Sequence, residues 1–135
     1  MLGWRGTFGK IVSKAIQKMK MELGSNPQDI ICCFCPSIRK CHFEVDEDVA
    51  IQCKELFSYT GRMDEIMQKG AIKEGKQKYH IDTILINRIL LQEEDILENN
   101  ILDCEICSVC HSDKIHSRRV EGIDFGLGCS IIERK

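Results

Sequence analysis

Apolar residues recur at helical spacing along residues 7–23 of the chain. Positions three and four apart are apolar over this segment, as one buried helix face requires. These positions are Phe8, Ile11, Val12, Ala15, Ile16, Met19 and Leu23. Gly24 follows directly and is a common helix stop, and Asn26 with Pro27 marks a turn. The pattern therefore predicts an amphipathic helix over residues 7–23.

A continuous apolar run, DIICCFC over residues 29–35, is closed by Pro36. Such a run, bounded by turn residues, is typical of a strand that is buried on both faces. A second helix is predicted from about Asp46, which suits an N-cap, with Glu47 and Asp48 in the first turn. Its apolar stripe is formed by Val49, Ala50, Cys53, Leu56 and Phe57.

The rest of the pattern alternates between helix and strand. Residues 60–79 are polar and interrupted by glycines, which favours a weakly structured connection. Residues 82–94 are apolar nearly all round and predict a third, well-buried helix. Residues 101–107 and 125–132 predict two more strands, the second weakened by its glycines. Together these elements predict an α/β (α+β) fold, with a mixed β-sheet core flanked by helices.

Length and charge narrow the class of protein. A chain of 135 residues, 43% hydrophobic and 30% charged, has the size and composition of one globular domain. Its net charge of -2 argues against non-specific binding to nucleic acid. No apolar run approaches the roughly 20 residues that cross a bilayer, so we expect no membrane partner. The first ten residues lack the apolar core of a secretory signal, and we expect a cytoplasmic protein.

Nine cysteines are the unusual feature of the composition. In a reducing compartment they act as core residues, metal ligands or nucleophiles, because disulfides are rare there. One zinc hypothesis uses Cys104, Cys107, Cys110 and His111, since thiols at this spacing often bind zinc. A second group consists of Cys32, Cys33, Cys35, Cys41 and His42. A zinc ribbon would pair Cys32 and Cys35 with Cys107 and Cys110, but strand alternation would point Cys32 and Cys33 to opposite faces.

Two basic segments are candidates for binding an anion. In Gly3-Trp4-Arg5-Gly6-Thr7, glycines flank Arg5 directly before a helix, whose free N–H groups favour negative charge. The alternative is a tight turn, with Trp4 in the core and Arg5 in an ion pair. Arg118 and Arg119, after Ser117, form the second candidate. Their alternative role is an ordinary surface turn.

Four blocks of the sequence, taken in order, resemble the laccase-domain family. This family is also called multicopper polyphenol oxidase-like, and its members are described as purine nucleoside phosphorylases. The resemblance covers about residues 1–133. The blocks are MLGWRGTFGKIVSKAIQKM, CFCPSIRKCHFEVDEDV, YHIDTILINRILL and CSVCHSDKIHSRR. They are similar to the family's HAGWRGT segment, its IGPSI turn with a YEV segment, its helix containing Asn-Arg, and its Cys-Thr-x-Cys segment leading to Ser-x-Arg-Arg.

The resemblance implies an enzyme that cleaves adenosine, inosine or similar nucleosides with phosphate. We expect Arg5, because of its glycine-flanked helix start, and Arg118, because of the Ser-x-Arg-Arg element, to contact the anion or substrate, with Arg119 and Ser37 as weaker candidates. The resemblance also implies a catalytic metal, usually zinc, or copper by the older family name, held by His, Cys and His. The third ligand position is occupied here by Met1, and thioether is a poor ligand for zinc. Cys35 occupies the glycine position of the IGPSI turn.

These departures lead to expectations about the chain as a whole. We expect residues 1–135 to form a single partial domain, the carboxy-terminal half of the laccase-domain fold, without the half that carries the first two metal ligands. We expect no zinc on the chain alone and no activity by itself. A truncated gene product, an upstream start and a separate amino-terminal chain remain open. An incomplete sheet also predicts open edges and self-association. The rival hypothesis is a small cysteine-rich, zinc-stapled interaction module.

Overall fold

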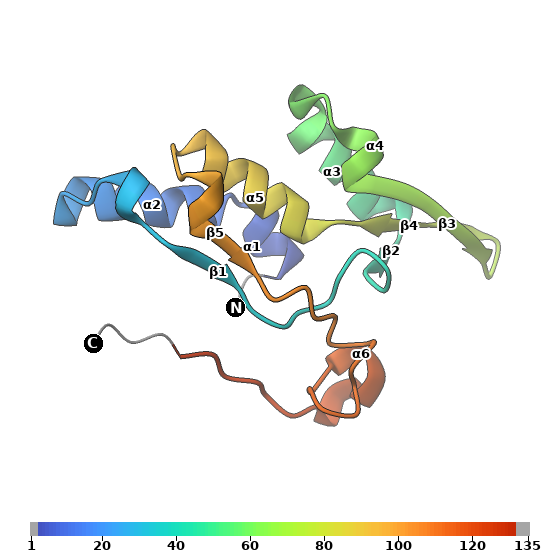
Figure 1. The fold of residues 1–135 in the computed structure, drawn as a ribbon. Coiled ribbons are helices and arrows are strands. Elements are labelled where there is room, and N and C mark those ends of the chain that lie inside the picture. Colours follow the sequence, from blue (N-terminus) through green and yellow to red (C-terminus); the bar gives the residue numbers. More distant parts are fainter. Residues whose placement is uncertain (1–2, 132–135) are drawn as a thin grey trace.

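A computed structural model of the chain describes residues 3–131, and its central element is helix α5 (Thr83–Glu93) (Figure 1). The helix begins where predicted, because the Asp82 carboxylate accepts a hydrogen bond from the Leu85 N–H at 2.9 Å. Ile86 and Leu90 are fully buried in one hydrophobic cluster, and Leu91 is buried in a second. Helix α5 therefore joins the two parts of the core.

The first cluster packs four helices against an antiparallel sheet. The helices are α1 (Trp4–Phe8), α3 (Glu47–Phe57), α4 (Met63–Ile66) and α5. The sheet has the order β2 (Glu44–Val45), β4 (Lys76–Ile81), β3 (Met67–Lys73). Inside it, the Asn87 amide donates to the Thr7 hydroxyl at 2.9 Å, so a buried hydrogen bond ties α1 to α5.

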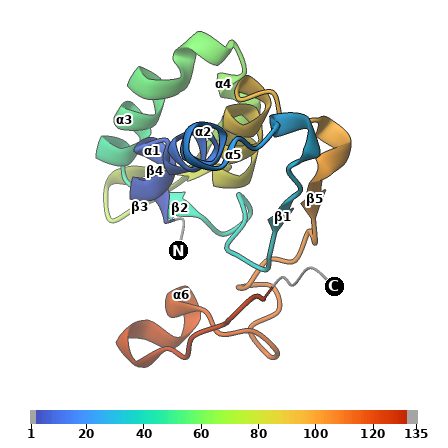
Figure 2. The ribbon, with the colours of Figure 1, turned by 90° about the vertical axis from the view of Figure 1, so that its left-hand side faces the viewer.

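The second cluster lies between helix α2 (Ile11–Leu23) and a two-stranded parallel sheet. Strand β1 (Cys32–Phe34) pairs with β5 (Ile101–Asp103), with Cys32 opposite Ile101 and Phe34 opposite Asp103. Figure 2 shows these strands side by side, with the carboxy-terminal segment below them. The mixed α/β architecture predicted from the sequence is confirmed.

The helix predicted over residues 7–23 is two helices. Lys10 has a left-handed backbone (φ 52°), which ends the run after α1 and starts α2 at a new angle. The apolar pattern spans this break because both helices face the core: Phe8 and Ile16 are buried. Ile11 and Leu23, which the pattern also assigned to the buried face, are 50% and 73% exposed.

The connection predicted over residues 60–79 is wrong. This segment forms α4, β3 and most of β4, joined by a two-residue turn. Glu74 and Gly75 both have positive φ, which is the turn geometry that matches the twist of a hairpin. Its polar composition hid the hairpin, since most of β3 is exposed and carries no apolar alternation.

This turn gives a stability prediction. Replacing Gly75 by alanine is expected to lower the free energy of unfolding by about 1 kcal/mol, because its φ of 73° is unfavourable for a side chain. Urea unfolding measures the change. Gly128→Ala is the matched control, since Gly128 has no positive φ and open space around its Cα. Equal effects at both glycines would contradict the turn assignment.

The strands are shorter than predicted. Strand β1 is not buried on both faces: Cys33 and Cys35 are exposed and Ile31 is 60% exposed, because only β5 pairs with it among residues 3–131. Strand β5 ends at Asp103, and residues 104–107 form a loop. Residues 125–131 form no strand, and residue 132 lies outside the described range. The helix from Asp46 is confirmed as α3, with Asp46 at the N-cap position, although its side chain pairs with Lys78 and makes no capping hydrogen bond.

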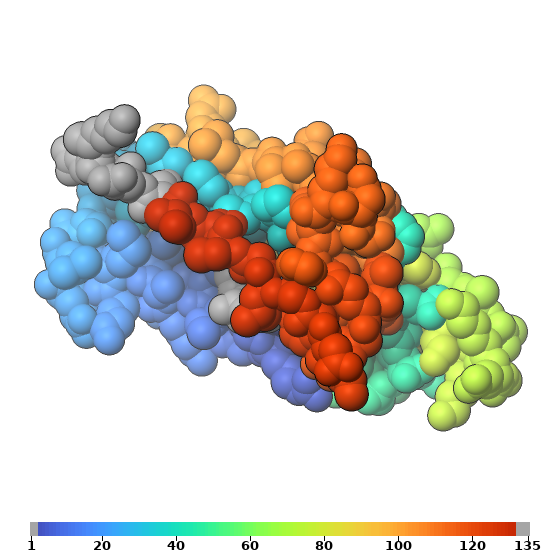
Figure 3. Space-filling model, turned by 90° about the horizontal axis from the view of Figure 1, so that it is seen from below, coloured from blue at the N-terminus to red at the C-terminus, as the bar shows by residue number. Residues whose placement is uncertain are grey.

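The carboxy-terminal segment lies against the rest of the molecule. Figure 3 shows it, in orange and red, crossing one face of the protein. It contains the short helix α6 (Arg118–Glu121) and a turn of 3-10 helix at Gly122–Asp124. Within residues 3–131, no helix combines the length and the apolar character needed to cross a bilayer.

Candidate functional site

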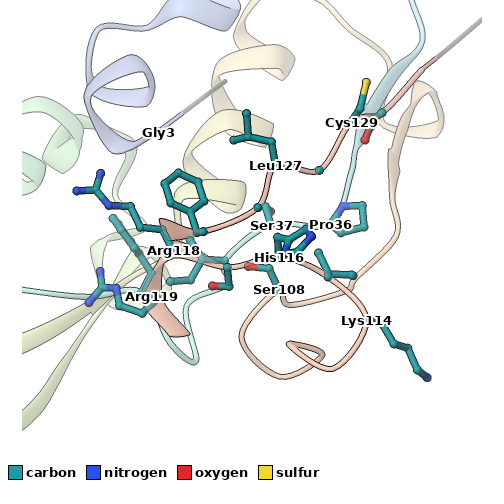
Figure 4. Close-up of a pocket in the computed structure, with 18 residues that line it drawn as sticks. Gly3, Pro36, Ser37, Ser108, Lys114, His116, Arg118, Arg119, Leu127 and Cys129 are labelled. Carbon is teal, nitrogen blue, oxygen red and sulfur yellow. The ribbon is translucent and has the colours of Figure 1, made fainter. Parts of the chain in front are cut away.

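A pocket of about 840 Å³ opens between the carboxy-terminal segment and the loop that follows β1. Its wall includes residues 36–38 after β1, residues 114–119 around the start of α6, and residues 125–130. Gly3 and Phe43 also line it. In Figure 4, Arg118 and Arg119 lie on one side, with Ser37, His116 and Ser108 close together near the centre. The pocket therefore joins residues from three of the blocks singled out in the sequence.

Glu121 organises the segment that carries the arginines. Its carboxylate accepts hydrogen bonds from the Ser117 N–H at 2.7 Å, the Gly126 N–H at 3.1 Å and the His116 ring at 2.9 Å. The two N–H groups, and then His116, hold the pKa of Glu121 below its usual value. A Cβ at Gly126 would lie 2.4 Å from the His116 ring, so glycine permits this close approach. The segment is therefore folded around one carboxylate.

The two arginines are held differently. The Arg118 guanidinium lies 6.0 Å from the Phe125 ring centre, and no hydrogen bond from it is seen among residues 3–131. Arg119 lies 5.9 Å from the Phe43 ring centre and donates to the Glu44 carbonyl at 3.1 Å. Arg118 thus keeps its donors for a ligand, while Arg119 has a structural contact.

Ser37 supplies a hydroxyl at the pocket wall. Its backbone is paired, since its N–H donates to the Ile106 carbonyl and its carbonyl accepts from the Ser108 N–H. Its side-chain Oγ is buried and has no hydrogen-bond partner within the described part of the chain. A buried polar atom without a partner is unfavourable and marks a place for a ligand or water. Cys35, two residues before Ser37, occupies the glycine position of the family's IGPSI turn. Its φ is not positive, so the turn does not require glycine there.

Arg5 lies elsewhere. Its guanidinium stacks 4.4 Å from the Trp4 ring centre, and the residue is exposed. From its segment only Gly3 reaches the pocket wall. No ion pair of Arg5 is found among residues 3–131, while Trp4 packs partly against the core. Of the four predicted anion or substrate residues, the structure therefore brings Arg118, Arg119 and Ser37 together, and leaves Arg5 outside.

A second constellation adjoins the pocket. Cys41, His42, Cys107 and Cys110 each offer one ligand atom, and these four atoms lie within 4.8 Å of one another. The His42 Nδ1 is 3.2 Å from the Cys41 sulfur, 3.4 Å from that of Cys110 and 3.7 Å from that of Cys107. The sulfurs of Cys41 and Cys110 are 3.9 Å apart.

The surroundings of the cluster shift the pKa values of Cys107 and Cys41 in opposite directions. Burial raises the pKa of Cys107, but hydrogen bonds from the backbone N–H groups of Cys110, Arg39 and Val109 outweigh burial, and the pKa falls to about 6. For Cys41, burial and the neighbouring thiols raise the pKa to about 12. Cys107 therefore ionises more readily than Cys41.

An ion pair fastens the two loops that carry this cluster. The Arg39 guanidinium forms a bidentate ion pair with the Asp103 carboxylate, with one N–O distance of 2.7 Å. Both side chains are less than a sixth exposed. Asp103 ends β5, and Arg39 precedes Cys41 by two residues. An isolated parallel bridge between Ser37 and Cys107 continues the pairing of β1 with β5. The loops are thus joined at two points beyond the pairing of β1 with β5.

Residues 2–135 match the model of the multi-copper polyphenol oxidoreductase laccase family. The chain belongs to this family. Among named relatives, this laccase-domain chain is 32% identical to a purine nucleoside phosphorylase of Bacteroides thetaiotaomicron over 124 residues, which is 92% of the chain and 44% of the relative. It is 30% identical to adenosine deaminase RL5 of an unknown prokaryotic organism, covering 98% of the chain and 48% of that protein.

Solved structures agree on the fold. The laccase-domain chain superposes on the hypothetical protein YfiH of Bacillus licheniformis with a TM-score of 0.74 and 28% identity. The match covers 87% of this chain and 42% of that one. YlmD of Geobacillus stearothermophilus, at 22% identity and a TM-score of 0.67, shows the same fold. The chain therefore spans less than half the length of these relatives.

The described residues that line the pocket do not include the set of three ligands that the resemblance implies for a catalytic metal. Its third ligand position, Met1, lies outside the described residues, so its placement there stays a prediction. Among residues 3–131, the group of at least three metal-ligating side chains is Cys41, His42, Cys107 and Cys110. None of these four residues lines the pocket. The pocket residues by themselves therefore do not fit a three-ligand catalytic metal.

The structure brings together some residues from each of the two groups that the zinc hypotheses named. Cys107 and Cys110 do meet part of the earlier cysteine group, but the partners are Cys41 and His42 rather than Cys32 and Cys35. Cys104 and His111 lie outside the four-residue group. The sequence features that pointed to this group were the adjacent pair Cys41-His42 and the Cys-x-x-Cys spacing of Cys107 and Cys110. Their meeting depends on the β1–β5 pairing, which spacing along the sequence does not reveal.

Proposed function

We propose that this chain is the carboxy-terminal half of a laccase-domain purine nucleoside phosphorylase. The reaction joins phosphate to the ribose C1 of adenosine or inosine and releases the base. The observation that carries the proposal is the grouping of Arg118, Arg119 and the unpartnered Ser37 hydroxyl around one pocket. The names of the related phosphorylases support it.

The pocket chemistry suits these two substrates. The Arg118 guanidinium has the planar donors that bind phosphate in pairs. Phe125 and Phe43 give apolar surface beside the arginines, suited to a purine ring or the ribose face. The Ser37 hydroxyl can exchange a hydrogen bond with a ribose hydroxyl or a phosphate oxygen. At about 840 Å³, the pocket lies within the usual range for small-molecule sites.

Exposed sheet edges support a partner for this chain. The two-stranded sheet has no further strand on either edge among the described residues. Ile31, next to β1, and Leu102, within β5, are 60% and 52% exposed. Such edges suit an amino-terminal half, or a second copy of this chain. We infer that the catalytic zinc is supplied with that half, and that this chain alone has no phosphorylase activity.

The free state of the cysteine thiols supports a reducing compartment for this protein. All nine cysteines lie within the described range and are free. Free thiols support a reducing compartment, and we place the protein in the cytoplasm.

The test is a chimera that joins the amino-terminal part of the Bacteroides relative to this chain. We expect phosphate-dependent formation of ribose 1-phosphate from adenosine or inosine, with no product from either part alone. The relative named adenosine deaminase suggests the competing activity. Conversion of adenosine to inosine without phosphate would favour deamination instead. A folded chimera, judged by circular dichroism, that turns over no nucleoside would refute the proposal.

A further inference from the structure

Two segments far apart in the sequence supply the Cys/His cluster described above. Cys41 and His42 lie in the turn before β2, and Cys107 and Cys110 lie in the turn after β5. The β1–β5 pairing, the Ser37–Cys107 bridge and the Arg39–Asp103 ion pair place these turns against each other. The four ligand atoms are therefore brought together by the fold, and not by neighbouring positions in one loop.

Their spacing matches a tetrahedral zinc site. With zinc–sulfur bonds of about 2.3 Å and zinc–nitrogen bonds of about 2.0 Å, tetrahedral geometry separates two sulfurs by about 3.8 Å and a sulfur from a nitrogen by about 3.5 Å. The sulfurs of Cys41 and Cys110 are 3.9 Å apart, and the three sulfur–nitrogen distances run from 3.2 to 3.7 Å. One ion at the centre would reach all four atoms with little movement.

Outer contacts hold the two turns that carry the ligands. Arg39, two residues before Cys41, binds the Asp103 carboxylate and donates to the carbonyl of Ile106, the residue before Cys107. Zinc binds cysteine as the thiolate, and outer contacts of this kind orient and stabilise the ligands. Three sulfurs and one imidazole form a soft, closed ligand set of the type found in structural zinc sites.

We propose that Cys41, His42, Cys107 and Cys110 bind one structural zinc ion, separate from the catalytic metal of the family and contrary to the expectation from the sequence that the chain alone holds no zinc. The donors are three thiolates and the Nδ1 of His42, and binding releases the thiol protons to solvent. Phe43 and Ser108 each follow a ligand in the sequence and line the pocket. The ion would hold the pocket wall in place by locking both turns. The proposal does not depend on the phosphorylase assignment.

The first experiment measures metal in the chain purified under reducing conditions with zinc present. We expect about one zinc per chain by elemental analysis, as a closed four-ligand site requires. Cys41→Ser and Cys110→Ser should each weaken zinc binding by more than about 100-fold, because even outer-shell changes cost 10- to 100-fold. Cys33→Ser and Cys35→Ser are the matched controls, since both thiols are exposed and lie outside the cluster.

Cobalt substitution gives a second readout that needs no variant and no activity. We expect the visible bands of tetrahedral cobalt with strong thiolate-to-cobalt charge transfer, lost on competition with zinc. Absence of zinc from the reduced chain, iron or copper in its place, equal binding by variants and controls, or a Cys41–Cys110 disulfide in the native protein would each overturn the proposal.

Discussion

Replacement of Arg118 by alanine, in the proposed enzyme completed by an amino-terminal half, is expected to lower kcat/KM for phosphorolysis by about 10- to 100-fold. A hydrogen bond to a charged group contributes about 1.5–3 kcal/mol, which corresponds to this range. Arg118 lines the pocket beside Phe125, and its donors are not committed to protein groups described here. The loss should appear mainly as a higher KM for phosphate, measured by varying phosphate at saturating nucleoside.

Two further variants sharpen this test. Arg119→Ala should have a smaller effect on the KM for phosphate, because Arg119 already donates to the Glu44 carbonyl. Lys54→Ala removes an exposed positive charge on α3, outside the pocket, and should leave the kinetics unchanged. Equal KM values for phosphate in Arg118→Ala and Lys54→Ala would remove Arg118 from the site.

Replacement of Asp103 by alanine is expected to lower the free energy of unfolding by roughly 2–3 kcal/mol. Breaking a buried pair costs about 3–5 kcal/mol, and this pair keeps a little exposure, which reduces the cost. Asp103 also accepts a hydrogen bond from the Glu105 N–H at 2.9 Å, so the turn that leads to Cys107 is loosened as well. Urea unfolding near pH 7 measures the change.

The same carboxylate predicts a pH dependence. Hydrogen bonding to Arg39 holds the pKa of Asp103 below its usual value in the folded protein. Its contribution is therefore present above the unfolded pKa of about 3.9, and is lost as the pH falls through the lower folded pKa. Asp103→Asn should match the native protein more closely in acid than at neutral pH. Asp113→Asn, at an exposed loop position, is the control. A gap between native protein and Asp103→Asn that does not change with pH would contradict this account.

The sequence was most informative where one helix face or one capping residue decides local structure. Helix α3 was predicted from Asp46 and the apolar stripe that follows it, and helix α5 from a run that is apolar nearly all round. Helix α2 was found, but its break from α1 was not, since Lys10 gives no signal of a left-handed backbone. The β3–β4 hairpin was missed because its residues are mostly polar, and its stability comes from pairing and from buried Tyr79 and Ile81.

For the sites, the sequence by itself determined the family and the chemical types of the residues: arginines, a serine hydroxyl and a surplus of thiols. Only the tertiary structure decided which of them meet. Ser37 and Arg118 share a pocket, Arg5 does not, and Cys41 and His42 join Cys107 and Cys110. The physical reason is that parallel strand pairing and the Arg39–Asp103 ion pair act between residues more than sixty positions apart. Local patterns of hydrophobicity carry no information about such long-range contacts.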